Sequence, residues 1–281
     1  MPPDRISGVT IDDVPIEAPG RARTGEIAYR VDGVGVELMS AEGPRQILRD
    51  ISFSVAVGEI VGVVGRSGTG KTTLLRVLGG LLPATTGSVQ LDGEPIKGPP
   101  RTVVTVFQDY GTALLPWRTV ARNVGLGLER DVPKAERQRR VADALHMVGL
   151  DGRESDHPWR LSGGMQQRVQ IARALALEPR VLLMDEPFGA LDAITKATLQ
   201  DELLRVHQQT AATMIFITHD IEEAIYLSDR VFVIAGSPGA LTLQETTGLP
   251  RPRHQIETRE LPRYLAVRHQ LGEALRVEDG S

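Results

Sequence analysis

The stretch GRSGTGKTT, residues 65–73, constrains the fold of this chain more than any other. It matches the pattern G-x-x-x-x-G-K-[ST], follows the apolar run EIVGVV and precedes a segment with helical spacing, so it is more than a glycine-rich turn that matches by chance. Gly68 and Gly70 lack a Cβ, which lets the backbone turn tightly and point its N–H groups at an anion. Lys71 can then reach the phosphates of a nucleotide, and the Thr72 hydroxyl can bind Mg²⁺. The predicted nucleotide-binding residues are Gly65, Arg66, Ser67, Gly68, Thr69, Gly70, Lys71, Thr72 and Thr73.

Further apolar runs predict the rest of the fold. VLLMDEP and MIFITHD are typical of strands buried on both faces, and they alternate with helical segments, as in a parallel α/β sheet. Residues 27–57 contain alternating runs such as ISFSV, which favour antiparallel strands. Charged helical segments without a convincing strand follow from about residue 109. We therefore expect a P-loop NTPase core with a mostly parallel sheet, an antiparallel β subdomain and a helical insertion subdomain at about 109–175.

The ends of the chain differ from this main domain, which we place at 26–247. Residues 1–25 are rich in proline, glycine and charge, and we expect a flexible tail there. Residues 248–281 begin as a proline-rich arm and continue as a short helix. On that helix, five apolar residues are expected partly on one face: Leu261, Leu265, Val267, Leu271 and Leu275.

Composition limits the classes of partner. The 281 residues carry a net charge of −4, and this near balance of acids and bases argues against nucleic acid. The chain has no cysteine, which excludes disulfides and thiolate metal sites. No apolar run approaches the roughly 18 residues of a membrane-spanning helix, and the N-terminus lacks the apolar core of a signal peptide. We expect a cytoplasmic chain that reaches a membrane only through a partner.

Four polar residues follow predicted strands and are candidates for the chemistry of the site. Asp185 ends VLLMD, at the sheet edge where the phosphate-binding loop lies, and is expected to hold Mg²⁺ directly or through water. Glu186 follows, and Pro187 is expected to redirect the chain so that Glu186 can orient or deprotonate the attacking water. Gln108, after VVTVF, is a candidate for contacting the metal and the water, and His219, after MIFIT, for contacting the γ-phosphate. Without the loop, a solvated acidic turn and a structural histidine would be the simpler interpretations.

A second glycine-rich stretch, LSGGMQQR, occupies residues 161–168. Ser162 is a good helix N-cap, and Gly163 and Gly164 can expose backbone N–H groups, so the stretch can form an anion site without a lysine. Local physics alone favours an ordinary capped helix.

The same stretch resembles the signature motif of ATP-binding cassette (ABC) ATPases. The order of GRSGTGKTT, Gln108, LSGGMQQR, VLLMDEP, GALD and His219 is similar to that family across roughly residues 27–236. The resemblance implies that two cassettes pair head to tail, so that Ser162, Gly163, Gly164 and Gln166 of one chain close on ATP held by the other. It places Asp192 of GALD at the interface, although the motif begins with Gly where many members have Ser. Members usually stack adenine on an aromatic residue, and VELMSAEGPRQ contains none, which leaves Met39 as a poor substitute.

Shorter motifs resemble one group within the family. LLPW followed by TV and NV, and the later GSPGAL and LPRPR, are similar to the ATPases of nitrate, sulfonate and taurine importers. This resemblance implies a homodimer, or a pair of close cassettes, with ATP and Mg²⁺, on the cytoplasmic face of the membrane. Membrane-spanning permease subunits and an extracytoplasmic solute-binding protein are the implied partners. A soluble non-transport cassette ATPase is the alternative, and a P-loop kinase or GTPase would leave LSGGMQQR and His219 unexplained.

Overall fold

The computed structural model describes residues 26–41, 43–108, 113–189 and 191–276, and the predicted tail of residues 1–25 lies outside these ranges. The strands within them are β1 (Ile27–Ser40), β2 (Gly43–Ala56), β3 (Ile60–Val64), β4 (Thr86–Leu91), β5 (Glu94–Pro95), β6 (Val103–Val106), β7 (Val181–Asp185), β8 (Thr213–Thr218), β9 (Arg230–Ala235) and β10 (Ala240–Thr246). The helices are α1 (Lys71–Leu78), α3 (Val120–Val124), α4 (Lys134–Met147), α5 (Gly163–Leu175), α6 (Ala193–Thr210), α7 (Ile221–Leu227), α8 (Glu257–Glu260) and α9 (Pro262–Arg276), with 3-10 turns η1 (Gly125–Leu128) and η2 (Pro158–Arg160).

The larger sheet has the strand order β10-β9-β3-β8-β7-β6, and all of these strands except β10 run parallel. Its central strands β3, β7 and β8 are buried along their whole length. Alternate residues of β3 face opposite hydrophobic clusters, with Ile60 and Val64 in one and Val61 and Val63 in the other. Because both faces are covered, these strands carry continuous apolar runs, and the prediction of a mostly parallel sheet is confirmed.

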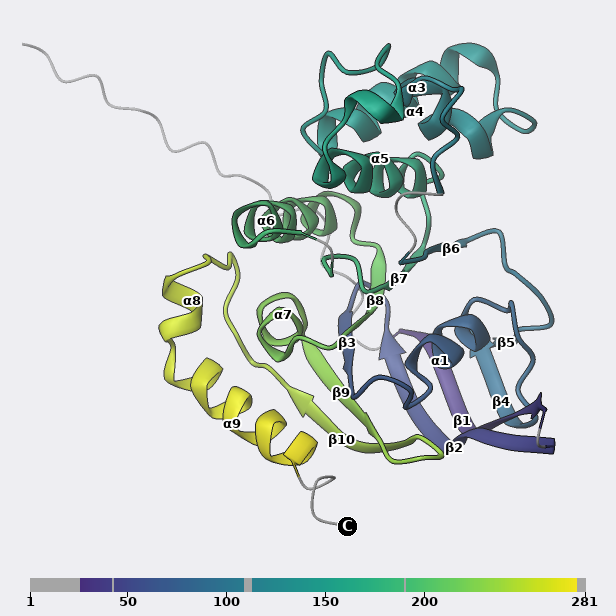
Figure 1. Ribbon diagram of the computed structural model, residues 1–281, viewed down its shortest axis with the longest axis vertical. Coiled ribbons are helices and arrows are strands. Elements are labelled where there is room, and N and C mark those ends of the chain that lie inside the picture. Colours follow the sequence, from purple (N-terminus) through teal and green to yellow (C-terminus); the bar gives the residue numbers. More distant parts are fainter. Residues whose placement is uncertain (1–25, 42, 109–112, 190, 277–281) are drawn as a thin grey trace, which may run out of the picture.

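The smaller sheet is antiparallel, in the order β2-β1-β4-β5, as the alternating pattern predicted. Helix α1 packs between the two sheets (Figure 1), since its Leu74 and Leu75 share a hydrophobic cluster with residues of β1 and β3. The buried Tyr29 hydroxyl donates a 2.9 Å hydrogen bond to the carbonyl oxygen of Leu78 at the end of α1. The helix that begins at the phosphate-binding loop is thus held by its buried face and by a hydrogen bond at its C-terminal end.

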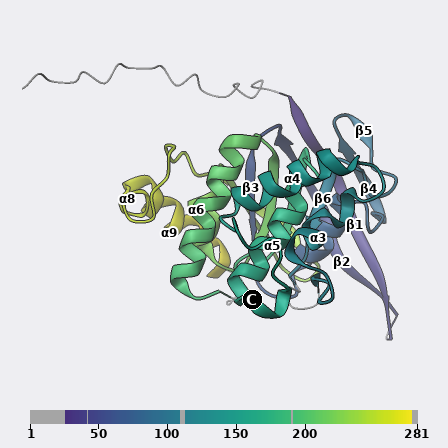
Figure 2. The same cartoon turned by 90° about the horizontal axis from the view of Figure 1, so that it is seen from above.

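Helices α3, α4 and α5 gather at one end of the molecule, where α5 contacts the edge strand β6 of the larger sheet (Figure 1). The described residues between β6 and β7 form no strand, in line with the helical segments expected there. A nearly buried ion pair joins this group to the core, because Arg168 of α5 lies 2.9 Å from the Glu202 carboxylate of α6, which runs near α5 (Figure 2). The limits of a separate helical subdomain stay a prediction.

The C-terminal arm differs from its prediction in one respect. Its main helix, α9, buries Tyr264, Val267 and Leu271 against the core, whereas Leu265 is 43% exposed. These three buried residues have the i, i+3, i+7 spacing of one helix face, and Leu265 lies outside that face. The prediction that Leu265 shares the apolar face is therefore wrong, because Tyr264 was not counted as an apolar anchor.

Tyr264 also binds the first turn of α7. Its hydroxyl donates to a Glu222 carboxylate oxygen at 2.5 Å and lies 3.2 Å from the Glu222 carbonyl oxygen. We expect Tyr264→Phe to lower the free energy of unfolding by about 2 kcal/mol, because a hydrogen bond to a charged group is lost in a buried setting. Urea unfolding followed by circular dichroism measures this. Leu265→Ala, on the same helix, should change stability by less than about 0.5 kcal/mol, and equal losses in both variants would contradict the assignment.

Candidate functional site: a nucleotide-binding loop with a carboxylate at its edge

The predicted phosphate-binding loop connects β3 to α1. Gly68 and Gly70 have φ angles of 85° and 90°, and Gly70 is the N-cap of α1. The Lys71 ammonium folds over the loop and donates to the carbonyl oxygens of Gly65 at 2.8 Å and Arg66 at 2.7 Å. The start of α1 and the Lys71 ammonium therefore both lie at this loop, an arrangement that suits a nucleotide phosphate.

A later segment that the sequence analysis did not assign to the loop packs directly against it. A Cβ added at Gly239 would lie 2.0 Å from the Thr69 carbonyl oxygen, so only glycine fits there. The Gly239 N–H also donates to the carbonyl oxygen of Ile47 on β2 at 2.9 Å. The signal in the sequence is the turn GSPGAL, whose resemblance to importers did not indicate that it packs against the loop.

Behind the loop, Asp185 and Thr72 form the oxygen-rich part of the site. Asp185 ends β7, is 5% exposed and accepts a hydrogen bond from the Thr72 side chain. Burial raises the pKa of the Asp185 carboxyl above its usual value, and this effect outweighs the Thr72 hydrogen bond and the Lys71 charge. A hydroxyl and a carboxylate beside a phosphate site are the ligand types that Mg²⁺ prefers, so the residues fit this ion.

Three predicted residues from three strand ends meet at one carboxylate oxygen. The Gln108 amide donates to Glu186 Oε2 at 2.9 Å, and His219 Nδ1 lies 3.3 Å from the same atom. Gln108 follows β6, Glu186 follows β7 and His219 follows β8, and these strands are neighbours in the sheet. The structure thus brings Gln108, Glu186 and His219 together, as expected for residues at the carboxyl ends of parallel strands.

The chain changes direction at Glu186 itself. Glu186 has a φ of 48°, and its N–H donates to the Ile217 carbonyl oxygen of β8 at 2.9 Å. A left-handed conformation costs energy for a residue with a side chain, and such strain concentrates at functional positions. The turn was expected from Pro187, but Glu186 makes it and so directs its carboxylate toward the sheet edge.

The signature-like stretch forms a capped helix start. Ser162 is the N-cap of α5, and its hydroxyl accepts a hydrogen bond from the Met165 N–H at 3.3 Å. Gly163 has open space around its Cα, whereas a Cβ at Gly164 would lie 2.6 Å from Thr195 of α6. Gln166 turns back and donates to the Pro158 carbonyl oxygen at 3.0 Å. This helix start belongs to the group of helices away from α1 (Figure 1), so it lies apart from the phosphate-binding loop, and its role as a second anion site stays a prediction.

Asp192 begins α6 close to the α5 start. Its carboxylate accepts from the N–H groups of Ile194 and Thr195, both at 3.1 Å, and from the Thr195 hydroxyl at 2.6 Å. These bonds to Thr195 and Ile194 lower the pKa of Asp192. Ile194, which the sequence analysis did not select, is 81% exposed beside it.

The contact for adenine is the least defined part of the site. Met39 is 80% exposed near the tip of the β1–β2 hairpin. The apolar side chains that approach the loop belong instead to Ile47 and Leu48, since a Cβ at Gly70 would lie 3.1 Å from Ile47 and 2.7 Å from Leu48. Met39 as an adenine contact stays a prediction.

A parallel sheet with a phosphate-binding loop and a carboxylate at its edge defines the class of P-loop nucleotide hydrolases. The sequence profile of the ABC transporter family matches residues 48–189. The chain is 44% identical over 242 residues to the nitrate import ATP-binding protein NrtD of Synechococcus elongatus, covering 84% of this chain and 87% of that protein. It is 49% identical over 213 residues to the aliphatic sulfonates import ATP-binding protein SsuB 1 of Xanthomonas axonopodis, covering 75% and 84%. The chain therefore belongs to the ABC transporter family, as an ATP-hydrolysing cassette.

Solved cassettes share the fold. The dimeric post-hydrolysis structure of the cassette MJ0796 bound to ADP and Pi superposes with a TM-score of 0.68 at 31% identity, covering 78% of this chain and 98% of that one. CbiO1 of Clostridium perfringens, part of the transporter complex CbiONQ, gives a TM-score of 0.73 at 25% identity, covering 90% and 99%. The predicted resemblance to ABC ATPases, the fold class and the ATPase activity are confirmed. Among the described residues, no helix is long and apolar enough to span a membrane.

Proposed function

We propose that this cassette is the energising subunit of a binding-protein-dependent importer for a small anion of the nitrate, sulfonate or taurine type. The similarity to NrtD and SsuB 1 over most of the chain supports this proposal. ATP binding would close a head-to-tail homodimer on the cytoplasmic face of the membrane, closure would move the permease subunits, and hydrolysis would reset them. The solute would arrive on an extracytoplasmic binding protein.

The meeting of Gln108, Glu186 and His219 at one carboxylate oxygen carries the catalytic part of the proposal. Glu186 would orient and deprotonate the attacking water, and His219 would contact the γ-phosphate. Mg²⁺ would be held by Thr72 and Asp185, with Gln108 as a further oxygen ligand, and would neutralise phosphate charge. Ser162, Gly163, Gly164 and Gln166 would close on the nucleotide of the partner chain, beside Asp192.

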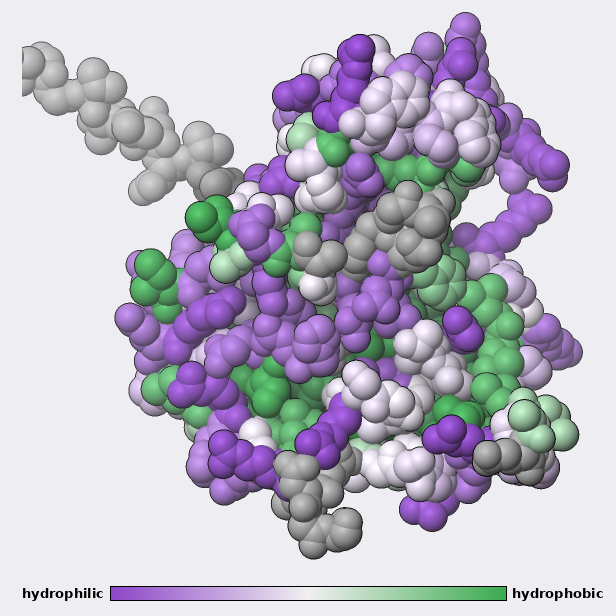
Figure 3. Space-filling view, in the orientation of Figure 1, coloured by the Kyte–Doolittle hydropathy of each residue, from purple (hydrophilic) through white to green (hydrophobic). Residues whose placement is uncertain are grey.

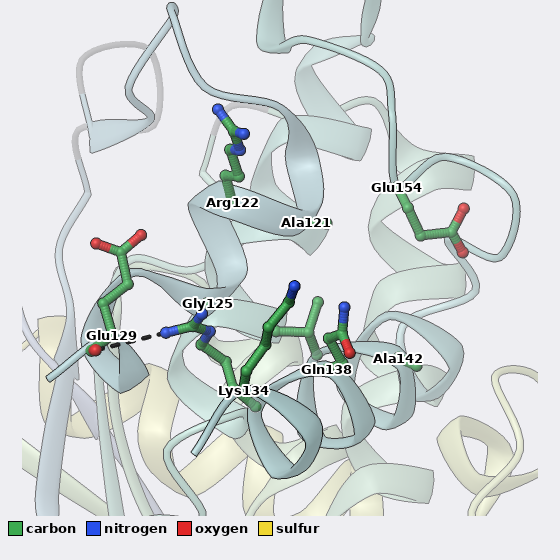
Figure 4. A pocket seen from close by; sticks show the side chains of 10 residues that line it. Ala121, Arg122, Gly125, Glu129, Lys134, Gln138, Ala142 and Glu154 are labelled. Carbon is green, nitrogen blue, oxygen red and sulfur yellow. Dashed lines mark hydrogen bonds between the residues drawn. The ribbon is translucent and has the colours of Figure 1, made fainter. Parts of the chain in front are cut away.

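A cavity in the helical group supports the contact with a membrane subunit. It has a volume of about 580 Å³ and is lined by Arg122, Glu129, Lys134 and Glu154 around apolar residues of α3 and α4 (Figure 4). On the face shown in Figure 3, mostly hydrophilic residues cover this helical group. Trp117, in the LLPW segment that precedes α3, is 71% exposed. A mixed cavity in the helical group, with an exposed tryptophan in the segment that leads into this group, would suit a short amphipathic helix of a permease, with the aromatic residue as its anchor.

Affinity capture from detergent-solubilised native membranes tests this function. We expect the tagged chain to recover a polytopic membrane protein in about equal amount, and Trp117→Ala to lose at least about tenfold of that recovery, because aromatic anchors contribute most of an interface. The ATPase rate of isolated Trp117→Ala should stay unchanged, while Trp159→Ala, with a similarly exposed tryptophan at 64%, should keep the permease.

Uptake of labelled nitrate, taurine and alkanesulfonates by cells with and without the gene then identifies the solute. Recovery of only soluble or nucleic-acid-bound partners would contradict the importer and favour a soluble cassette ATPase. ATP consumption only in the presence of an added phosphate acceptor would instead favour a kinase.

A further inference from the structure

A cluster of charged side chains joins α6 to the segment that carries His219. The Lys196 ammonium of α6 lies 2.7 Å from Asp220 Oδ2 and pairs with the Glu223 carboxylate of α7. The Thr218 hydroxyl, at the end of β8, donates to the same Glu223 carboxylate. The four residues Lys196, Asp220, Glu223 and Thr218, here called the Lys196 network, lie outside the phosphate-binding loop.

This network fixes the backbone on both sides of His219. Thr218 and Asp220 are its direct neighbours, and the Asp220 N–H donates to the Thr218 hydroxyl at 3.0 Å. Asp220 also caps α7 by accepting from the N–H of Glu222 at 2.8 Å. The His219 side chain itself is 60% exposed, so packing does little to hold its ring. The position of the ring beside Glu186 therefore depends mainly on the backbone that the network holds.

The charges of the network depend on the lysine. Glu223 is 3% exposed, and burial raises the pKa of its carboxyl although Lys196 and Thr218 act against this. Burial acts on Asp220 in the same direction, but the hydrogen bond and charge of Lys196 hold the pKa of Asp220 below its usual value. Without the cation, the buried Glu223 carboxylate and the partly exposed Asp220 carboxylate would lie close together uncompensated, which is unfavourable above all for Glu223. A cavity of about 340 Å³ beside them gives the segment room to rearrange.

Lys196 also ties this segment to the start of α6. Its own N–H donates to the Asp192 carbonyl oxygen at 2.9 Å, one turn after the residue proposed for the dimer interface. The start of α6 is therefore connected in two directions. Asp192 faces the proposed dimer interface, and the Lys196 side chain pairs with Asp220 and Glu223. Figure 1 shows α6 and α7 as neighbouring helices beside β8.

We propose that Lys196 is a positioning residue that holds His219 against Glu186 and links this contact to the start of α6. The proposal rests on the function proposed above for Glu186 and His219. If the start of α6 moved, the Lys196 ion pairs would carry this movement to the segment that holds His219. Asp192 would not need to contact the nucleotide of its own chain for this effect.

Lys196→Met and Lys196→Arg test the catalytic part. We expect Lys196→Met to lower kcat for ATP about tenfold to hundredfold, with KM changed by less than about threefold, because a catalytic group displaced by an ångström loses rate rather than binding. Lys196→Arg should restore most of the rate, since it can make both ion pairs. If Lys196→Met does not fold, Lys196→Met/Glu223→Gln removes one of the two unpaired carboxylates and should show the same loss of kcat. A kcat within about threefold of wild type in a folded variant would overturn the proposal.

The ring-proton NMR signals of His219 distinguish positioning from mere stability. His219→Ala assigns these signals in the nucleotide-free cassette, and we expect Lys196→Met to shift them while the signals of the exposed His146 stay in place. A lower kcat with unshifted His219 signals would overturn the proposal. A different result would contradict the proposed function, namely normal ATP hydrolysis by Glu186→Gln. The NMR comparison of His219 does not depend on that result, so the two proposals can fail independently.

Discussion

Glu186→Gln is expected to lower kcat for ATP hydrolysis by about 10²–10⁴-fold while ATP binding persists. Glutamine keeps the size of the side chain and can still bond to Gln108, which now donates to Glu186 Oε2 at 2.9 Å. It cannot accept a proton from water, and general-base catalysis contributes a factor of this size. The variant should therefore accumulate as an ATP-bound dimer. Phosphate release under steady-state conditions measures the rate, and size-exclusion chromatography with ATP measures the dimer.

The exposed Glu257 of α8 provides the matched control for this variant. Glu257→Gln makes the same chemical change far from any proposed nucleotide contact, and its rate should equal that of the wild type. A Glu186→Gln rate within about threefold of wild type would contradict the base assignment and leave Glu186 as a residue that only orients Gln108 and His219.

The part of the site that follows strands could be predicted from the sequence. Residues at the carboxyl ends of neighbouring parallel strands must lie at one edge, so Gln108, Glu186 and His219 could be grouped before their contacts were known. The phosphate-binding loop is equally local, because its glycines, lysine and flanking strand and helix are consecutive. The N-cap role of Ser162 was correct for the same reason.

The parts that depend on contacts between distant segments could not be predicted. Lys196 and Asp220 are separated by 24 residues, and no periodicity in either helix shows that they pair. The left-handed conformation of Glu186 depends on how its N–H meets Ile217 of the next strand, whereas sequence reasoning assigned the turn to Pro187. In α9, leucine content suggested the wrong face, because Tyr264 is buried through a hydroxyl contact with Glu222 on another helix. Local patterns determine elements, and tertiary packing decides which of their side chains meet.

Two inactive variants are expected to recover activity when they are mixed. Lys71→Ala removes the lysine that folds over the phosphate-binding loop. Gly163→Asp places a carboxylate at the signature-like helix start, where it would repel the phosphates of the partner's ATP. Gly163 is exposed with open space around it, and an acidic residue in the first turn of α5 favours the helix, so this variant should fold. Each variant alone should hydrolyse ATP at least about a hundredfold more slowly than wild type, because a misplaced or missing phosphate contact acts on the transition state.

In a head-to-tail heterodimer of these variants, one composite site carries both substitutions and the other carries neither. In a 1:1 mixture about half of the dimers are heterodimers, and one of the two sites in each heterodimer is intact. About a quarter of all composite sites should therefore be intact. Steady-state and single-turnover phosphate release measure this recovery. Lys71→Ala mixed with the double variant Lys71→Ala/Gly163→Asp contains no intact site and should stay inactive. If the first mixture is no more active than its components in either assay, each site is built within one chain, and the second glycine-rich stretch is only a capped helix. Recovery would instead show that the lysine and the helix start act on the same nucleotide from two different molecules.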